Sequence, residues 1–342
     1  MRTNRVLSLI LVILIVCSSG LNATSTKAAN TIFQHLSKED YSEMTLELNF
    51  DELFQQLKSE EEHKAQLIMK SPADVVTAFQ VKIKPRGVFR RYNCDIPPLR
   101  FNFSKKELEA LGLDGEYDKL KLVAPCFDDP QSEQQLLKEY WAYQFYNQIT
   151  SASFQVHLVR ITYVNTGAEE FQKEQWAFFM EGKDELAHRL GGAVVDQYGT
   201  LPTELESNSY QQTMLFNYMI GNEDWDLGAN RNITLVQLAE DAPLILIPYD
   251  FDYSVFVSPS YLKGVKHIDQ QGIYERILIG QFKDLETLTE TAEIFQLAEE
   301  LILASFDAFT PLQQEHKNSM RKYLKDFFSL LENEKKLARQ LL

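Results

Sequence analysis

The most informative part of the sequence runs from Gly221 to Ser254. It reads Gly221-Asn222-Glu223-Asp224-Trp225-Asp226-Leu227-Gly228-Ala229-Asn230-Arg231-Asn232, continues through an apolar run, and ends with Pro248-Tyr249-Asp250-Phe251-Asp252-Tyr253-Ser254. The apolar run divides at Glu240-Asp241 into two segments, 233–238 and 242–247, which read as a β pair. A β pair between two acidic turns brings carboxylates and amides to one end of a sheet. A divalent metal, or a hydroxyl that must lose its proton, needs such a grouping.

Three interpretations account for these acidic turns. Glu223, Asp224 and Asp226 lie within four residues, and Asp250 and Asp252 alternate along an extended turn. They indicate a metal-binding or phosphoryl-transfer site, a structural calcium turn, or an ordinary surface loop in an acidic protein. Residue types alone support the metal-binding or phosphoryl-transfer site about as well as they support the other two interpretations.

Composition narrows the class of protein. The chain has 342 residues, of which 44% are hydrophobic and 12% aromatic. Such a chain buries a sizeable core, and its length suits two lobes or one large α/β unit. The formal net charge of -15 argues against a nucleic-acid partner, because phosphate neutralisation needs clustered Lys and Arg.

The first residues have the pattern of a signal peptide. Arg2 and Arg5 precede an apolar core at 6–16, and small residues follow up to Gly20. We therefore expect a signal peptide at 1–20, a flexible leader at 21–42, and an exported protein, periplasmic or extracellular, with no transmembrane segment after cleavage. Cys17 offers a second outcome, a membrane lipoprotein.

Export would leave two cysteines, Cys94 and Cys126. A pair of cysteines in an oxidising compartment favours a disulfide over two buried thiols. Neither has a second Cys or a His at ligand spacing, so a zinc site is not expected.

The segments before the acidic stretch contain one basic cluster, Arg86-Gly87-Val88-Phe89-Arg90-Arg91-Tyr92-Asn93-Cys94. It reads either as a solvated hairpin whose arginines pair with nearby acids, or as an anion site built from Gly87 and Arg86. Residue types favour the hairpin. Periodicity predicts a helix at 52–64, a buried helix at 132–149, and helices at 285–305 and 311–342.

Several of these motifs together resemble the spore-coat CotH kinase family, a group of atypical protein kinases. The resemblance rests on Asp224, an Asn at 230 or 232, the β pair, and the Pro248-Tyr249-Asp250-Phe251-Asp252 turn, where Tyr249 stands in place of the usual Trp. Upstream, the strands at 159–165 and 176–181, Arg86-Gly87, and the Pro-Pro-Leu-Arg strand at 97–100 are also similar to that family.

The resemblance implies a fold and an activity. The fold would be α+β, a two-lobed atypical protein-kinase-like fold with antiparallel sheets and an all-helical C-terminal part. Residues 43–180 would form the N-lobe-like region, and residues 181–342 the C-lobe-like region with the acidic site. The activity would be Mg²⁺-dependent phosphoryl transfer from ATP to a Ser or Thr of a protein substrate.

The same resemblance assigns roles to residues. Asp224 would be the catalytic base, and Asn230 or Asn232, Asp250 and Asp252 would hold the metal. Nucleotide binding would involve a cation paired with Glu139, with candidates Arg100, Lys119 and Lys121, together with Arg86 and Glu181.

Two alternatives to the active enzyme are open. Tyr249, export, and the change from Lys to Arg if Arg100 fills the Lys position favour a kinase-fold binding protein of the cell envelope without turnover. The acids alone also fit a structural domain stabilised by Ca²⁺.

Overall fold

The computed structural model describes residues 30–38, 42–59, 61–87, 90–257 and 276–342. The predicted signal peptide, with Cys17, and part of the predicted leader lie outside these residues. Every helix within the described ranges is too short or too polar to cross a lipid bilayer.

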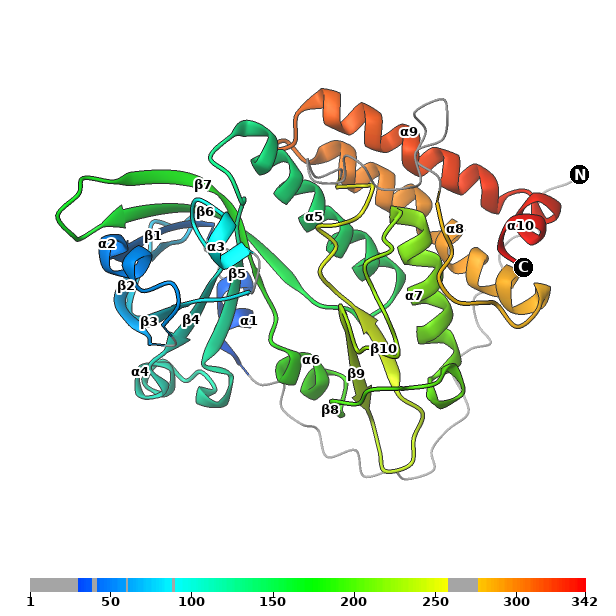
Figure 1. The fold of residues 1–342 in the computed structure, drawn as a ribbon, viewed down its shortest axis with the longest axis horizontal. Coiled ribbons are helices and arrows are strands. Elements are labelled where there is room, and N and C mark those ends of the chain that lie inside the picture. The colour runs from blue at the N-terminus through cyan, green and yellow to red at the C-terminus, as the bar shows by residue number, and fades with distance from the viewer. Residues whose placement is uncertain (1–29, 39–41, 60, 88–89, 258–275) are drawn as a thin grey trace, which may run out of the picture.

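Seven strands of the N-terminal half close into a mixed barrel, in the order β1-β2-β3-β4-β5-β7-β6 (Figure 1). The strands are β1 (Glu43–Leu48), β2 (His63–Lys70), β3 (Val76–Pro85), β4 (Leu99–Phe103), β5 (Lys119–Val123), β6 (Val156–Asn165) and β7 (Gln172–Met180). All neighbours are antiparallel except β1 and β6, which run parallel and close the barrel.

The prediction of a two-lobed kinase-like fold with antiparallel sheets is therefore wrong. The parallel pairing of β1 with β6, from Glu43 opposite Arg160 to Leu48 opposite Asn165, joins the two ends of the sheet. A closed barrel leaves no unpaired strand edge, whereas an open sheet leaves two. The prediction failed because hydrophobic periodicity carries no information about this long-range pairing.

Two local predictions in the same region also fail. The helix predicted at 52–64 is only α2 (Phe50–Gln55), because the chain turns and enters β2 with alternating burial. Part of the predicted flexible leader forms α1 (Ile32–Lys38), whose Ile32, Phe33 and Leu36 are buried in the barrel core. These buried side chains explain why that segment is ordered.

The rest of the molecule, which consists of α5 (Pro130–Ile149) and the chain after β7 and is here called the helical part, packs against one end of the barrel (Figure 1). Its long helices are α5, α7 (Ser207–Ile220), α8 (Leu285–Ala308), α9 (Gln314–Leu331) and α10 (Glu334–Leu341). A small sheet in the order β10-β9-β8 joins them, formed by β8 (Ala193–Val195), β9 (Ile233–Gln237) and β10 (Ile245–Pro248). The predicted β pair is confirmed as β9 and β10, and the C-terminal part is helical as expected.

Short helical elements lie between these strands and long helices. They are α3 (Arg90–Asn93), α4 (Lys105–Ala110), η1 (Gly115–Tyr117), α6 (Lys183–Arg189) and η2 (Pro202–Glu204). Helix α5 lies within the predicted 43–180 region, but most of its buried side chains belong to the core of the helical part.

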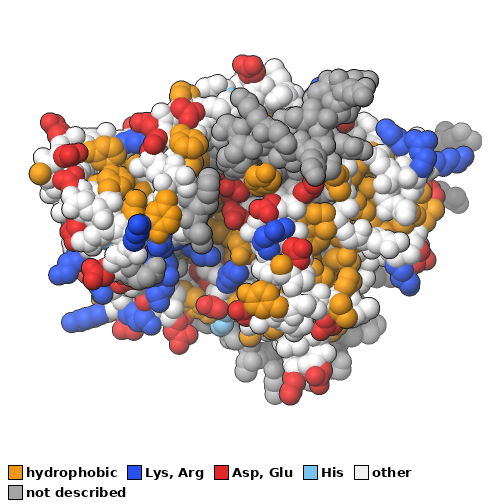
Figure 2. Space-filling view, in the orientation of Figure 1, with side chains coloured by type: hydrophobic (Ala, Val, Ile, Leu, Met, Phe, Trp, Pro, Cys, Tyr) orange, Lys and Arg blue, Asp and Glu red, His pale blue; other side chains and the backbone are white. Residues whose placement is uncertain are grey.

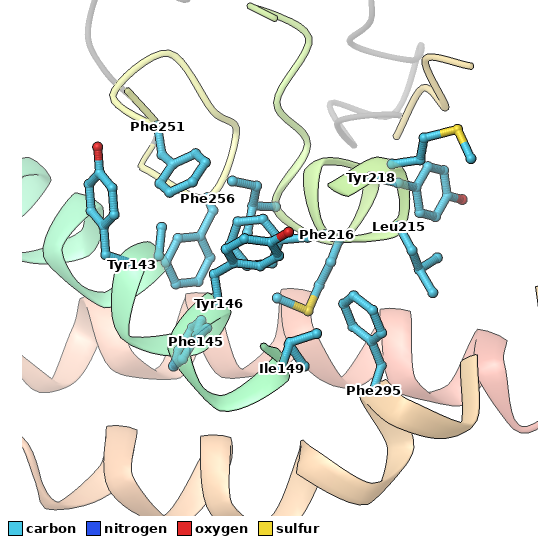
Figure 3. Close-up of a cluster of buried hydrophobic side chains, with 14 of the residues drawn as sticks. Tyr143, Phe145, Tyr146, Ile149, Leu215, Phe216, Tyr218, Phe251, Phe256 and Phe295 are labelled. Carbon is cyan, nitrogen blue, oxygen red and sulfur yellow. The ribbon is translucent and has the colours of Figure 1, made fainter. Parts of the chain in front are cut away.

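An aromatic core fixes the acidic turn after β10 against α5 and α7 (Figure 3). Phe251, which is fully buried, lies with its ring 4.7 Å from Tyr143 of α5 and 5.3 Å from Phe216 of α7. Full burial of such a side chain contributes about 1.5–3 kcal/mol. The residues on either side of Phe251, Asp250 and Asp252, are thereby held at the boundary between the barrel and the helical part.

Candidate functional site

Two adjoining cavities lie where the barrel meets the helical part, and together they are called the cleft. Their volumes are about 220 Å³ and about 590 Å³, and Arg90, Glu139 and Asp250 line both. The smaller cavity is also lined by Arg86 and Lys121. Figure 2 shows acidic and basic side chains gathered together along this junction.

Asp250 enters the cleft on an unusual backbone. Its φ of 65° lies in the left-handed region, which is costly for most side chains and less so for Asp and Asn. Its N–H donates to the phenolic oxygen of Tyr143 at 2.8 Å, and the preceding Tyr249 N–H donates to the Asn232 carbonyl at 3.0 Å. With Phe251 buried behind it, the turn has few other conformations available.

Asp224 reaches the cleft from the loop that follows α7. Gly221 ends that helix with a φ of 64°, and the Asp224 N–H donates to Asn222 Oδ1 at 3.1 Å. Asn232 Nδ2 donates to Asp224 Oδ2 at 3.0 Å, and Arg231 Nε lies 3.4 Å from Asp224 Oδ1. Partial burial raises the pKa of the Asp224 carboxyl, an effect that Arg231 opposes.

Of the two asparagines predicted to assist a metal, the structure brings Asn232 to Asp224. Asn230 instead donates from Nδ2 to Asp196 Oδ1 at 2.8 Å, in an exposed contact. Both have positive φ, 49° and 54°, so both belong to one tight loop. Asn232 therefore contacts the predicted catalytic base, whereas Asn230 contacts Asp196.

The carboxylates of the cleft repel one another. Glu139, on α5, is 3% exposed, and burial followed by the charges of Asp252 and Asp250 raises its pKa well above the ordinary value. Burial, followed by the Asp252 carboxylate, raises the pKa of Asp250 to about 6. A ligand that adds positive charge beside these groups would therefore be stabilised by them.

Burial and mutual repulsion also act on the cations of the cleft. Burial, followed by the charge of Arg86, lowers the pKa of Lys121 to about 8. Burial also lowers the pKa of Arg86, and its Nε is buried with no hydrogen-bond partner among the described residues. A buried donor without an acceptor is costly, so this guanidinium is prepared to bind an anion.

Three residues were predicted as candidates for the cation that pairs with Glu139. Of Arg100, Lys119 and Lys121, only Lys121 lines the cleft. Lys119 is exposed and lies 3.6 Å from Asp118. Arg100 is opposite Lys121 in the β4–β5 register but lies outside the two cavity linings. Glu181, also outside those linings, is 1% exposed and bonded to Arg189 Nε at 2.7 Å.

Sequence reasoning missed Arg90 and Tyr143. Arg90 Nη1 lies 3.7 Å from Asp252 Oδ2, and its Nη2 donates to the Ala124 carbonyl at 2.6 Å. A signal was present, because Arg90 belongs to the basic cluster. The preferred interpretation of that cluster is wrong about the hairpin, because the cluster contains α3, and Arg86 and Arg90 line the cleft. Its expectation that an arginine pairs with a nearby acid is confirmed for Arg90. No sequence signal distinguishes Tyr143 from the other aromatic residues of α5.

The predicted disulfide is confirmed. Cys94 and Cys126 are bonded, which joins the segment after α3 to the segment after β5. Cys126 lines the larger cavity.

The residues of the cleft fit a metal only in part. The described residues contain no group of three or more His, Cys, Asp or Glu side chains arranged to hold a metal ion. Ca²⁺ takes 6–8 oxygen ligands, so the calcium-stabilised interpretation finds no preformed cage in the described residues. Mg²⁺ commonly uses one or two carboxylates together with substrate phosphates, and Asp250 and Asp252 beside Arg86 and Lys121 fit that arrangement.

Comparison of the chain with protein-family models finds no match, and comparison with curated proteins also finds none. The resemblance to the CotH kinase family remains a prediction from short motifs.

Proposed function

We propose that this chain binds a nucleoside triphosphate with Mg²⁺ in the cleft and transfers a phosphoryl group to a hydroxyl, that of a protein Ser or Thr. One observation carries the proposal: Arg86 and Lys121 share a cavity with Glu139 and Asp250. Phosphoryl transfer needs charge neutralisation, positioning and one base, and little else from the protein. The proposal therefore depends on the cleft and not on a two-lobed fold.

The triphosphate would lie against the cations of the smaller cavity. The buried Nε of Arg86 has no acceptor among the described residues, and a phosphate oxygen would supply one. Protonated Lys121 would add a point charge on the same side. Gly87, which also lines this cavity, has open space where a Cβ would lie, so the backbone there offers no obstacle to a ligand.

Asp250 and Asp252 would hold Mg²⁺, which when bound would neutralise charge on the phosphate oxygens. Their own mutual repulsion, which contributes to the raised pKa of Asp250, would be relieved at the same time. Glu139, which lines both cavities, would remain under the influence of the positive charges of Arg90 and Arg86.

Asp224 would accept the proton of the attacking hydroxyl. Its raised pKa brings it nearer to the working pH, which favours a general base. The hydrogen bond from Asn232 Nδ2 to Asp224 Oδ2 would hold the carboxylate in orientation. The hydroxyl oxygen would then bond to phosphorus as the bond to the leaving phosphate oxygen breaks.

An equilibrium titration of the full chain with ATP and Mg²⁺ tests the binding step. We expect saturable binding by the wild type and by Asp241→Asn, and loss of binding in Asp250→Asn. The control matches well, because Asp241 also has a positive φ, 60°, but lies in the exposed turn between β9 and β10.

Transfer of labelled phosphate to a protein acceptor tests the chemical step. Transfer that survives in Asp224→Asn would remove the proposed role of that carboxylate. Binding without any transfer would favour the envelope binding protein over the enzyme. A stability gain with Ca²⁺ alone, and none with nucleotide, would contradict both.

We also propose an exported location for the protein, with an envelope or extracellular protein as the acceptor. The Cys94–Cys126 disulfide is compatible with an oxidising compartment. Alkylation of the native protein followed by mass measurement tests this, and free thiols in protein recovered from its host would contradict it.

A further inference from the structure

The Cys94–Cys126 disulfide fastens the segment that carries Arg90. Arg90 is the first residue of α3, and Cys94, which follows that helix, donates its N–H to the Arg90 carbonyl at 3.1 Å. On the other side of the disulfide, the Ala124 carbonyl accepts the 2.6 Å hydrogen bond from Arg90 Nη2. A covalent bond and a side-chain hydrogen bond thus connect the same two segments.

Backbone hydrogen bonds reinforce this connection. The Asp95 N–H donates to the Cys126 carbonyl at 2.8 Å, and the Asp128 N–H donates to Asp95 Oδ2 at 2.6 Å. Helix α3 itself has only 4 residues, and none of its four described side chains is buried. Because so short a helix is not stable alone and has no buried face, its position depends on these connections.

Arg90 connects the segment held by the disulfide to the acidic side of the cleft. It lines both cavities, and its Nη1 lies 3.7 Å from Asp252 Oδ2, with the two side chains 23% and 24% exposed. Cys126 lines the larger cavity beside it. The side chain of Arg90 therefore reaches from the disulfide-bonded segment to the acidic site.

We propose that the Cys94–Cys126 disulfide positions Arg90 for a phosphate ligand, so that reduction of the disulfide weakens ligand binding in the cleft. This inference rests on the proposed function. In the reduction, a dithiol reductant supplies two electrons and two protons, the S–S bond becomes two thiols, and the reductant becomes a disulfide.

The experiment measures the dissociation constant for ATP with Mg²⁺ on the full chain, oxidised and after mild reduction of the folded protein. The variants are Arg90→Gln, Cys94→Ser with Cys126→Ser, and their combination. Because a hydrogen bond to a charged group is involved, we expect reduction, or Arg90→Gln, to weaken binding by roughly 10-fold or more. The combined variant should be no weaker than Arg90→Gln alone, because both changes remove the same interaction.

Arg91→Gln is the matched control. Arg91 lies one residue further along α3 and outside both cavity linings, and its Nη2 donates to the Pro85 carbonyl at 2.8 Å. Arg91→Gln removes the same charge as Arg90→Gln but outside the cleft. We therefore expect this variant to retain most of the affinity for ATP with Mg²⁺. A loss equal to that of Arg90→Gln would overturn the specific role of Arg90.

Two results separate the inference from the proposed function. If the oxidised protein binds ATP with Mg²⁺ and reduction lowers only its unfolding temperature, the disulfide is merely structural and the inference alone is overturned. If the oxidised protein binds neither ATP nor inorganic tripolyphosphate with Mg²⁺, the proposed function is overturned as well. Amide hydrogen exchange at 90–95 in the ligand-free protein gives a further test, since exchange unchanged by reduction would also overturn the inference.

Discussion

The N–H of Asp250 donates a 2.8 Å hydrogen bond to the phenolic oxygen of Tyr143. The two residues are 107 positions apart, on the turn after β10 and on α5. This bond orients the backbone of a residue with positive φ, whose carboxyl lines both cavities of the cleft. It therefore connects the aromatic core directly to the acidic site.

Tyr143→Phe should destabilise the protein and weaken ligand binding together. The substitution removes the acceptor of the Asp250 N–H, and an unsatisfied buried polar group costs about 1–3 kcal/mol. Urea unfolding measures this cost, with Tyr198→Phe as the control because Tyr198 is 73% exposed. Equal stability of the two variants would show that the bond contributes nothing to the free energy of folding.

Asp250→Asn should abolish binding of ATP with Mg²⁺ and yet stabilise the ligand-free protein at neutral pH. Because the folded-state pKa of Asp250 is raised from 3.8 to about 6, the ionised carboxylate opposes folding, and stability falls as pH rises from about 4 to about 6. Removing the charge should add roughly 1–3 kcal/mol to the free energy of unfolding at pH 7. Chemical denaturation at pH 7 measures the effect, and a destabilised Asp250→Asn protein would contradict it.

Because of Lys121, the affinity of the cleft for phosphate should fall as pH rises, whereas the stability of the protein should increase. Its folded-state pKa is lowered from 10.5 to about 8. Phosphate affinity should fall as pH rises through about 8, because Lys121 loses its charge. The contribution of Lys121 to stability should rise from about pH 8 to about 10.5, because the unfolded chain there binds more protons than the folded one.

The Lys121 prediction is measured with nucleotide titrations and unfolding curves at pH 7 and 9. Lys121→Gln should remove both dependences, whereas Lys119→Gln, on the same strand but exposed, should retain them. Identical pH profiles for the two variants would mean that another group is responsible.

Glu185→Gln should reduce the pH dependence of protein stability that arises where Glu185 contacts the start of α1. The Thr31 hydroxyl, just before α1, donates to the buried Glu185 carboxyl of α6. Burial raises the pKa of Glu185 from 4.5 to about 7, so its contribution to stability falls as pH rises between these values. Unfolding measured at pH 5 and pH 8 should show a smaller difference for Glu185→Gln than for the wild type.

If the wild type and Glu185→Gln respond to pH alike, Glu185 does not titrate in this range. Thr31→Val provides an independent check, because it removes the hydroxyl and keeps the shape of the side chain. It should destabilise the protein at both pH values.

Much of the acidic site was predictable from the sequence, because it lies in local segments. Pro248 to Asp252 form one turn, and Asp224 and Asn232 belong to one loop joined by a direct hydrogen bond. The β pair between them follows from a hydrophobic pattern with a turn in the middle. In such cases the residues that act together are close in sequence, so spacing carries the information.

The cationic side of the cleft was less predictable. Its cations come from three places in the chain: Arg86 directly follows β3, Arg90 begins α3, and Lys121 lies on β5. The sequence left three candidates for the cation that pairs with Glu139. Lys119 and Lys121 are two residues apart on β5, and the packing of the barrel end against the helical part decides that Lys121 lines the cleft while Lys119 is exposed. Spacing on one strand does not say which end of the strand meets another part of the chain.

Sequence patterns alone were enough to predict the β9–β10 pair, the helical C-terminal part, the disulfide partners and the acidic turns. Each depends on periodicity, turn chemistry or cysteine number, which are local or compositional properties. The tertiary structure decided the closed barrel and the choice of cations, because both depend on contacts between distant segments. The parallel pairing of β1 with β6 joins residues more than 100 positions apart, and no local preference encodes such a pairing.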